Sequence, residues 1–101
     1  MVENEPRDLI ESVLLRPQVY TIAGTFEEAV AFLVGYVSGL AKCRPRDPVV
    51  IRWNNLELAA AERTGRSITD GISCVRTQFP SGDDALRELQ RLYRECLNQD
   101  S

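Results

Sequence analysis

The sequence has no histidine among its 101 residues, and its six glycines form neither a Gly-x-Gly-x-x-Gly nor a Walker pattern. Without histidine there can be no Ser-His-Asp triad, no Cys-His pair, no histidine metal ligand and no imidazole base near neutral pH. Without a glycine-rich loop, no phosphate-binding turn is indicated. We therefore expect a protein that is not an enzyme and needs no cofactor.

Cysteine is also scarce. Cys43, Cys74 and Cys96 are odd in number and widely spaced, and none belongs to a Cys-x-x-Cys pair. This pattern does not make a disulfide framework. A zinc site with three thiolates and a carboxylate is one alternative, but we expect buried structural thiols and no metal.

The chain lacks any long hydrophobic run. A bilayer-spanning helix needs roughly 18–20 apolar residues, and the longest apolar stretch, Ala29 to Ala41, is interrupted by Gly35, Ser38 and Gly39. The N-terminus, Met1 to Glu5, is acidic and has no signal-peptide character. We expect a cytoplasmic protein that does not contact a membrane.

The chain has 15 acidic and 12 basic residues, which give it a net charge of −3. A nucleic-acid-binding domain usually carries a basic excess, so nucleic acid is an unlikely partner. The length allows one hydrophobic core, and we expect a single helical domain over residues 1–101.

Apolar residues recur with helical spacing along most of the chain. A first helix is predicted from about Pro6 to Arg16, where Pro17 ends it. In the second, Thr25 and Glu28 form a capping box, and the helix continues to Ala41. Its apolar residues lie on nearly every side, which predicts a central, buried helix with Phe32, Leu33 and Tyr36 in the core. Gly35 and Gly39, one turn apart, leave a shallow groove where another helix can approach.

Three further helices are predicted. One begins at Asn54 or Asn55 and ends at Arg63 or Thr64, before Gly65. The others run from Ser67 or Thr69 to Thr77 and from Asp84 to about Leu97. Val49 to Ile51 are β-branched and are expected to be extended, although Asp47-Pro48 could instead cap a helix that starts there. The predicted fold is all-α, a compact bundle of four or five short helices around a buried second helix.

Two short motifs occur in this part of the chain, one at the end of the first predicted helix and one within the second. Residues Arg16–Tyr20 read Arg-Pro-Gln-Val-Tyr, and Phe32–Tyr36 read Phe-Leu-Val-Gly-Tyr. The chain thereby resembles a group of short bacterial proteins that carry Arg-Pro-x-x-Tyr and then Phe-Leu-x-Gly-Tyr, many of them similar to immunity partners of polymorphic toxins. That group often has Gly-Met at Gln18-Val19 and Leu-Gly at Thr21-Ile22. The resemblance implies a non-catalytic protein that binds and masks a toxin domain.

Four residues are candidates for binding such a partner. Many toxin domains attack nucleic acids through basic clefts, to which the carboxylates of Glu57, Glu62 and Asp70 would be complementary. Trp53 is a possible desolvated anchor, because tryptophan is enriched in binding hot spots. A single tryptophan after an apolar run is more often a core residue, so both roles of Trp53 remain open.

A second interpretation is a small DNA-binding transcriptional regulator. Residues 58–76 resemble a helix-turn-helix, in which Arg63, Arg66 and Arg76 could face phosphates. The match is weakened by Gly71, which stands near the position where the second helix should bury an aliphatic side chain. The nearby acidic residues also offset the positive charge.

Overall fold

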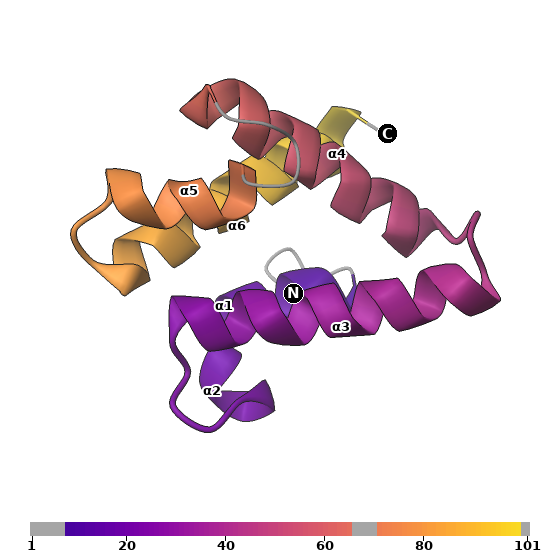
Figure 1. The fold of residues 1–101 in the computed structure, drawn as a ribbon, viewed down its shortest axis with the longest axis horizontal. Coiled ribbons are helices and arrows are strands. Elements are labelled where there is room, and N and C mark those ends of the chain that lie inside the picture. The colour runs from indigo at the N-terminus through magenta and orange to yellow at the C-terminus, as the bar shows by residue number, and fades with distance from the viewer. Residues whose placement is uncertain (1–7, 66–70, 100–101) are drawn as a thin grey trace, which may run out of the picture.

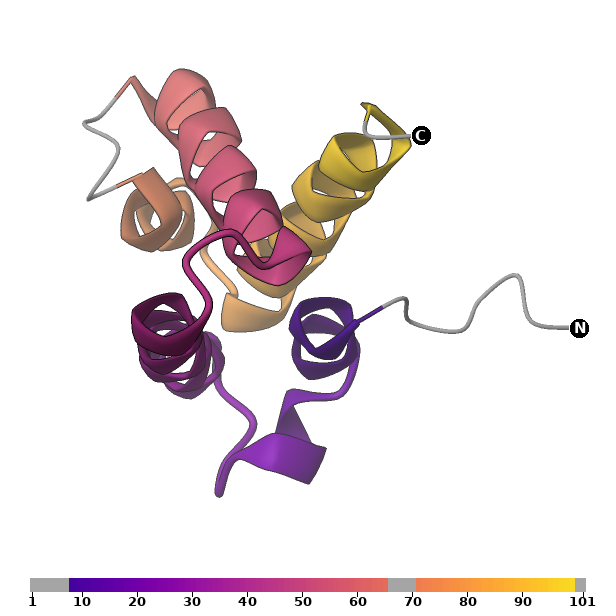
Figure 2. The same cartoon turned by 90° about the vertical axis from the view of Figure 1, so that its right-hand side faces the viewer.

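The computed structural model describes residues 8–65 and 71–99, which form six α-helices and no strand (Figure 1). The predicted all-α fold is confirmed. In both views α1, α2 and α3 form a lower tier, and α4, α5 and α6 form an upper tier (Figures 1 and 2). The helices are α1 (Leu9–Leu15), α2 (Pro17–Tyr20), α3 (Phe26–Cys43), α4 (Pro48–Thr64), α5 (Gly71–Gln78) and α6 (Gly82–Gln99).

The described residues form six helices, whereas four or five were predicted. The additional helix is α2, which Pro17 starts after ending α1. Arg16 closes α1, donating its backbone N–H to the Ser12 carbonyl at 3.0 Å. Pro17 then occupies the first position of α2, where its missing N–H costs nothing and its fixed φ favours helix. One turn of helix therefore follows where a loop was expected.

A buried carboxylate at the start of α1 joins three helices. Asp8 caps α1 by accepting the Glu11 backbone N–H at 3.0 Å. Its other carboxylate oxygen accepts hydrogen bonds from the fully buried Tyr93 hydroxyl of α6 and from the Arg52 guanidinium of α4, the latter at 3.1 Å. Because a buried charge is costly unless it is paired, these contacts fix α1 against both other helices.

Two more polar contacts run along the same side of α1. The Arg94 guanidinium donates to the buried carboxylate of Glu11 at 3.1 Å. Near the end of α1, the Gln90 side-chain amide donates to the Leu14 carbonyl at 2.7 Å, satisfying an acceptor that the helix terminus leaves unpaired. Between these contacts Ile10, Val13 and Leu14 enter the core, so α6 holds α1 by polar and apolar contacts together.

The prediction that the second long helix, α3, is buried at the centre is wrong. Its capping box is present: Thr25 accepts the Glu28 N–H at 3.1 Å, and the Glu28 carboxylate accepts the Ala23 N–H at 2.7 Å. The helix nevertheless buries one face only, through Phe26, Ala29, Leu33 and Val37. Of the expected core residues Leu33 is fully buried, whereas Phe32 and Tyr36 are half-buried at the edge of the core.

The segment from Val49 to Ile51 is the first turn of α4, and the prediction of an extended lead-in is wrong. The Asp47 carboxylate accepts the Val49 backbone N–H at 2.9 Å, and Pro48 occupies the first helical position. These two start signals outweigh the β-preference of the valines and isoleucine. Gly65 ends the helix as predicted, in the left-handed conformation with φ of 70°.

Helix α5 begins in contact with the backbone of α4. A Cβ placed on Gly71 would lie 2.6 Å from the Ala61 nitrogen and 2.8 Å from its Cα. Only glycine allows this approach, which brings Ile72 and Val75 of α5 into the core. The predicted start of this helix at Ser67 or Thr69 lies outside the described residues, and the described helix extends through Gln78.

We predict that Gly71→Ala lowers the free energy of unfolding by about 1–3 kcal/mol, because the new methyl group meets backbone that cannot rotate away. Gly39→Ala is the control, since a Cβ at Gly39 meets nothing within 4 Å. The control should stabilise the protein by up to about 1 kcal/mol through helix propensity. Urea unfolding measures both, and equal effects would contradict the close packing of α5 on α4.

We also predict that Tyr93→Phe lowers the free energy of unfolding by about 1–3 kcal/mol, because it leaves the buried Asp8 carboxylate short of one donor while preserving the ring. Tyr20→Phe serves as control, since the Tyr20 side chain lies at the surface. Thermal and urea denaturation of the two variants should differ clearly. Similar stabilities would mean that the Tyr93 hydroxyl contributes nothing to the joining of α1 and α6.

Candidate binding groove

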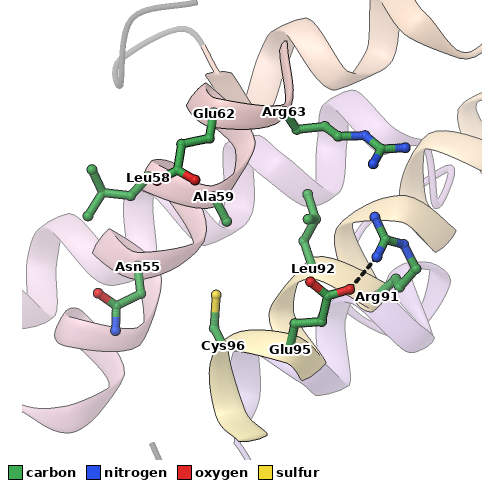
Figure 3. Close-up of a pocket in the computed structure, with 9 residues that line it drawn as sticks. All are labelled: Asn55, Leu58, Ala59, Glu62, Arg63, Arg91, Leu92, Glu95 and Cys96. Carbon is green, nitrogen blue, oxygen red and sulfur yellow. Dashed lines mark hydrogen bonds and ion pairs between the residues drawn. The ribbon is translucent and has the colours of Figure 1, made fainter. Parts of the chain in front are cut away.

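A groove of about 550 Å³ lies between α4 and α6. The two helices diverge toward the top of Figure 2, and Figure 3 shows the side chains that each contributes. Ala59 of α4 and Leu92 and Cys96 of α6 supply its apolar surface, with Leu92 and Cys96 buried. The remaining lining residues are polar, charged or exposed at the rims: Asn55, Leu58, Glu62, Arg63, Arg91 and Glu95.

The charges at one end of the groove form a connected network. Glu88 of α6, only 8% exposed, accepts hydrogen bonds from Arg91 at 2.8 and 3.0 Å and lies 3.2 Å from the Arg63 guanidinium of α4. Arg91 also pairs with Glu95, one turn along α6 (Figure 3). The network therefore fixes the guanidinium groups at the groove wall and joins α4 to α6.

The network also shifts the ionisation of its members. Hydrogen bonding and charge attraction from Arg91, with a further contribution from Arg63, hold the pKa of Glu88 below its ordinary value despite the opposing effect of burial. The same contacts raise the pKa of the Arg91 guanidinium. Both groups are therefore held in their charged forms, and neither is available for proton transfer near neutral pH.

Glu62 gives the groove, taken together with its charge network, its net sign. The lining side chains Glu62, Glu95, Arg63 and Arg91 balance in charge. With the buried Glu88, which pairs with both arginines but does not line the groove, the set has three carboxylates and two guanidinium groups, an excess of one negative charge. Glu62 is exposed and has no ion-pair partner in the described part of the chain. A cation brought into the groove would therefore meet a carboxylate that pairs with no cationic side chain of residues 8–65 and 71–99.

Trp53 belongs to the core. Its side chain is 4% exposed and packs in the same apolar cluster as Leu56 and Tyr93. It cannot present its ring to a partner without unfolding α4, so its predicted role as a binding anchor is wrong. The other role considered for Trp53, that of a core residue, agrees with its burial.

The structure does not bring the predicted carboxylates together on one surface. Glu57 and Glu62 are five residues apart in α4, which places them about 140° apart around the helix axis. Glu62 lines the groove, whereas Glu57 does not and is half-buried, with its pKa raised by desolvation. Asp70 lies outside the described residues. Of the four predicted binding residues, Glu62 alone has a described place in the groove.

Sequence reasoning missed Leu58, which is 49% exposed at the rim of the groove. The signal was present: Val50, Trp53 and Leu56 recur with the period of one buried face, and Ile51 and Leu58, two turns apart, fall outside it. That pattern emerges only when the helix is taken to start at Pro48. Leu92, Glu95 and Cys96 could not be assigned to a groove before the packing of α6 on α4 was known.

The arginines of the predicted helix-turn-helix segment take part in contacts within the chain. Arg63 lies 3.2 Å from Glu88, and Arg76 lies 3.3 Å from Glu27 and donates to the Phe79 carbonyl at 2.8 Å. Arg66 is outside the described residues. Binding of phosphates by Arg63 and Arg76 would have to compete with these carboxylates.

The two halves of the Arg-Pro-x-x-Tyr and Phe-Leu-x-Gly-Tyr pattern meet in the fold. The ring of Tyr20 at the end of α2 lies against the ring of Phe32 in α3, with centroids 5.9 Å apart and planes tilted by 51°. Pro17 is buried at the turn between α1 and α2. These residues hold α2 against α3, on the opposite tier from the groove (Figure 1).

The described residues contain no cluster of three or more side chains suited to a metal ion, and no helix among them has the length and apolarity to cross a bilayer. The expectation of three buried thiols is wrong for Cys43, which is exposed, while Cys74 is half-buried and Cys96 is buried in the groove wall. No protein family, curated protein or solved structure matches the chain.

We predict that Glu88→Gln lowers the free energy of unfolding at pH 7 by about 1–3 kcal/mol, the range for losing charge-assisted hydrogen bonds. Because the folded pKa of Glu88 is depressed, its stabilising contribution is present above the unfolded value of 4.5 and is lost as pH falls through the folded pKa. The stability difference between the wild type and the variant should therefore shrink below about pH 4.5.

Glu62→Gln is the matched control, since Glu62 has no ion pair in residues 8–65 and 71–99. Urea unfolding at several pH values should show little change for this variant. If Glu88→Gln behaved like the control at every pH, the network would not join α4 to α6 energetically.

Proposed function

We propose that the protein is a non-catalytic binding protein that takes up part of a partner protein in the α4–α6 groove. The observation that carries the proposal is the combination of the exposed Leu58 with the unpaired carboxylate of Glu62 at one rim of a groove of about 550 Å³. An exposed aliphatic side chain offers a partner apolar surface to bury, and a carboxylate beside it supplies charge complementarity.

The chemistry of the groove indicates what it would hold. Its apolar surface at Ala59, Leu92 and Cys96 would accept an aliphatic or aromatic side chain, and Glu62 would pair with a lysine or arginine. Arg63 and Arg91 are neutralised within the network, so they would not repel such a cation strongly. The partner segment is therefore expected to carry a basic residue next to an apolar one.

We further propose that the partner is a bacterial toxin domain, which this protein neutralises in the cytoplasm as an immunity protein. The resemblance of Arg16–Tyr20 and Phe32–Tyr36 to short immunity-like proteins supports the toxin, and the carboxylate of Glu62 at the groove suits the basic cleft of a nucleic-acid-degrading domain. Binding over that cleft would block access of the toxin's substrate, without turnover by this protein.

The experiment that tests the proposal is titration of the purified protein against the activity of any toxin domain that a neighbouring gene encodes. Protection should saturate near a one-to-one ratio, because a blocking partner acts by occupancy. Protection at strongly sub-stoichiometric amounts would instead indicate an enzyme that inactivates the toxin or repairs its target. Absence of both protection and a complex would contradict the immunity function, and tight, salt-sensitive binding to duplex DNA in a gel shift would favour the transcriptional regulator.

Two substitutions locate the binding surface, and both should leave the fold intact because both side chains are exposed. Leu58→Ala should mainly accelerate dissociation, by roughly 10-fold or more if Leu58 is an anchor. Glu62→Gln should mainly slow association and reduce its dependence on salt. Ile22→Ala, which truncates an aliphatic side chain that is 98% exposed between α2 and α3, is the control and should bind like the wild type. Equal binding by all four proteins would place the interface elsewhere.

A further inference from the structure

The outer face of α3 is open over most of its length. Near its start, Glu27 pairs with Arg76 of α5, and Ala31 borders a hollow that Arg76 and Thr77 also line. Opposite its buried residues, the helix exposes Ala31, Gly35, Ser38 and Gly39, with the exposed Val34 beside them. Figure 2 looks along α3 and shows it at the lower left edge of the molecule, with α1 to its right, α5 directly above it and α4 above and to the right. A Cβ at Gly35 or at Gly39 would meet nothing within 4 Å.

Within the described residues, no backbone conformation or close contact requires glycine at Gly35 or Gly39 on this face. Gly24 and Gly65 adopt φ of 70°, and Gly71 lies against the α4 backbone, so each of these positions requires glycine. Gly35 and Gly39 are in the interior of a regular helix, where glycine is among the least favourable residues. What their missing side chains permit is the close approach of a helix from outside the chain.

Charges at the two ends of α3 indicate how such a helix would be oriented. Glu27 and Glu28 stand in its first turn, where Glu27 already pairs with Arg76 of α5 and Glu28 forms no ion pair among the described residues. Lys42 stands in its last turn, followed by Arg44 and Arg46. The three basic side chains are exposed and have no ion-pair partner among the described residues. A helix that is acidic at one end and basic at the other is complementary to an antiparallel copy of itself.

The spacing of these residues is symmetric about Gly35. Ala31 precedes Gly35 by four residues and Gly39 follows it by four, while Glu28 precedes it by seven and Lys42 follows it by seven. A two-fold axis at Gly35 therefore sets Ala31 against Gly39 of a second copy, and Glu28 against Lys42 of that copy. Each contact occurs twice, as in any isologous interface. A parallel pair would instead place Lys42 against Lys42.

We propose that two copies of this chain pair through the outer faces of α3, antiparallel and centred on Gly35. Glu28 remains able to take part, because the Ala23 N–H uses one of its carboxylate oxygens and leaves the other to accept from Lys42. One helix face per copy gives an interface at the small end of the known range, so the dimer should dissociate in the micromolar range or above. The pairing leaves the α4–α6 groove open and does not depend on the proposed function.

Sedimentation equilibrium of the full chain, from micromolar to millimolar concentration, tests the proposal. The average mass should rise from the 11.4 kDa of one chain toward twice that value. Gly35→Leu should remain monomeric throughout, and its fold is not expected to suffer, because the new side chain points into open space. Asn54→Leu, which adds the same apolar group at an exposed site on α4, is the control and should dimerise like the wild type.

Lys42→Gln fixes the orientation and provides a second variant that does not depend on Gly35. Antiparallel pairing predicts a dimer weakened by about 2- to 10-fold, since two exposed ion pairs are lost, whereas a parallel pair would be tightened by the loss of like-charge repulsion. A mass that stays at one chain at every concentration would overturn the proposal. So would a dimer that Gly35→Leu leaves intact, or one that Lys42→Gln strengthens.

Discussion

The structure depends on one carboxylate. Asp8 caps α1 and at the same time accepts from Tyr93 of α6 and Arg52 of α4, so a single buried charge determines where three helices meet. Apolar packing alone would tolerate some sliding of short helices over one another, because it has no preferred direction. A buried carboxylate tolerates little movement of the helices, because each hydrogen-bond donor that moves away leaves the charge unsatisfied. The pKa of Tyr93 is raised by burial and by this carboxylate, so its hydroxyl stays protonated and continues to donate.

The second polar cluster determines the shape of the candidate binding surface. The Arg63–Glu88 pair joins α4 to α6 near the end of α4. Arg52, through which α4 contacts Asp8, lies nearer the start of the same helix. The groove lies between the two helices and is lined by side chains of both (Figure 3). Arg63, Glu88 and Arg91 are paired within the chain, whereas Leu58 and Glu62 are exposed at the rim of the groove.

The structure presents two separate surfaces of different character. The groove combines apolar and charged side chains, and the carboxylate of Glu62 has no ion pair among the described residues. The outer face of α3 carries small side chains, with acidic residues in its first turn and Lys42 in its last turn. If both proposals hold, a dimer would display two grooves, each able to hold one partner molecule, and partner binding would not require the dimer to separate.

The sequence by itself determined the helical class, the ends of most helices and the capping of α3, because these depend on contacts within a few residues: Thr25 with Glu28, and Gly65 after Thr64. It misjudged Val49 to Ile51, where a local propensity for strand competed with a local cap at Asp47 and Pro48. Tertiary structure alone decided that α3 buries one face, that Trp53 is internal and that Glu57 and Glu62 diverge. The ion pairs of Asp8 with Arg52 and of Glu11 with Arg94 join residues far apart in the chain, and no periodicity in the sequence encodes such a distance. The candidate groove belongs to the same category, because it exists only where α4 and α6 pack together.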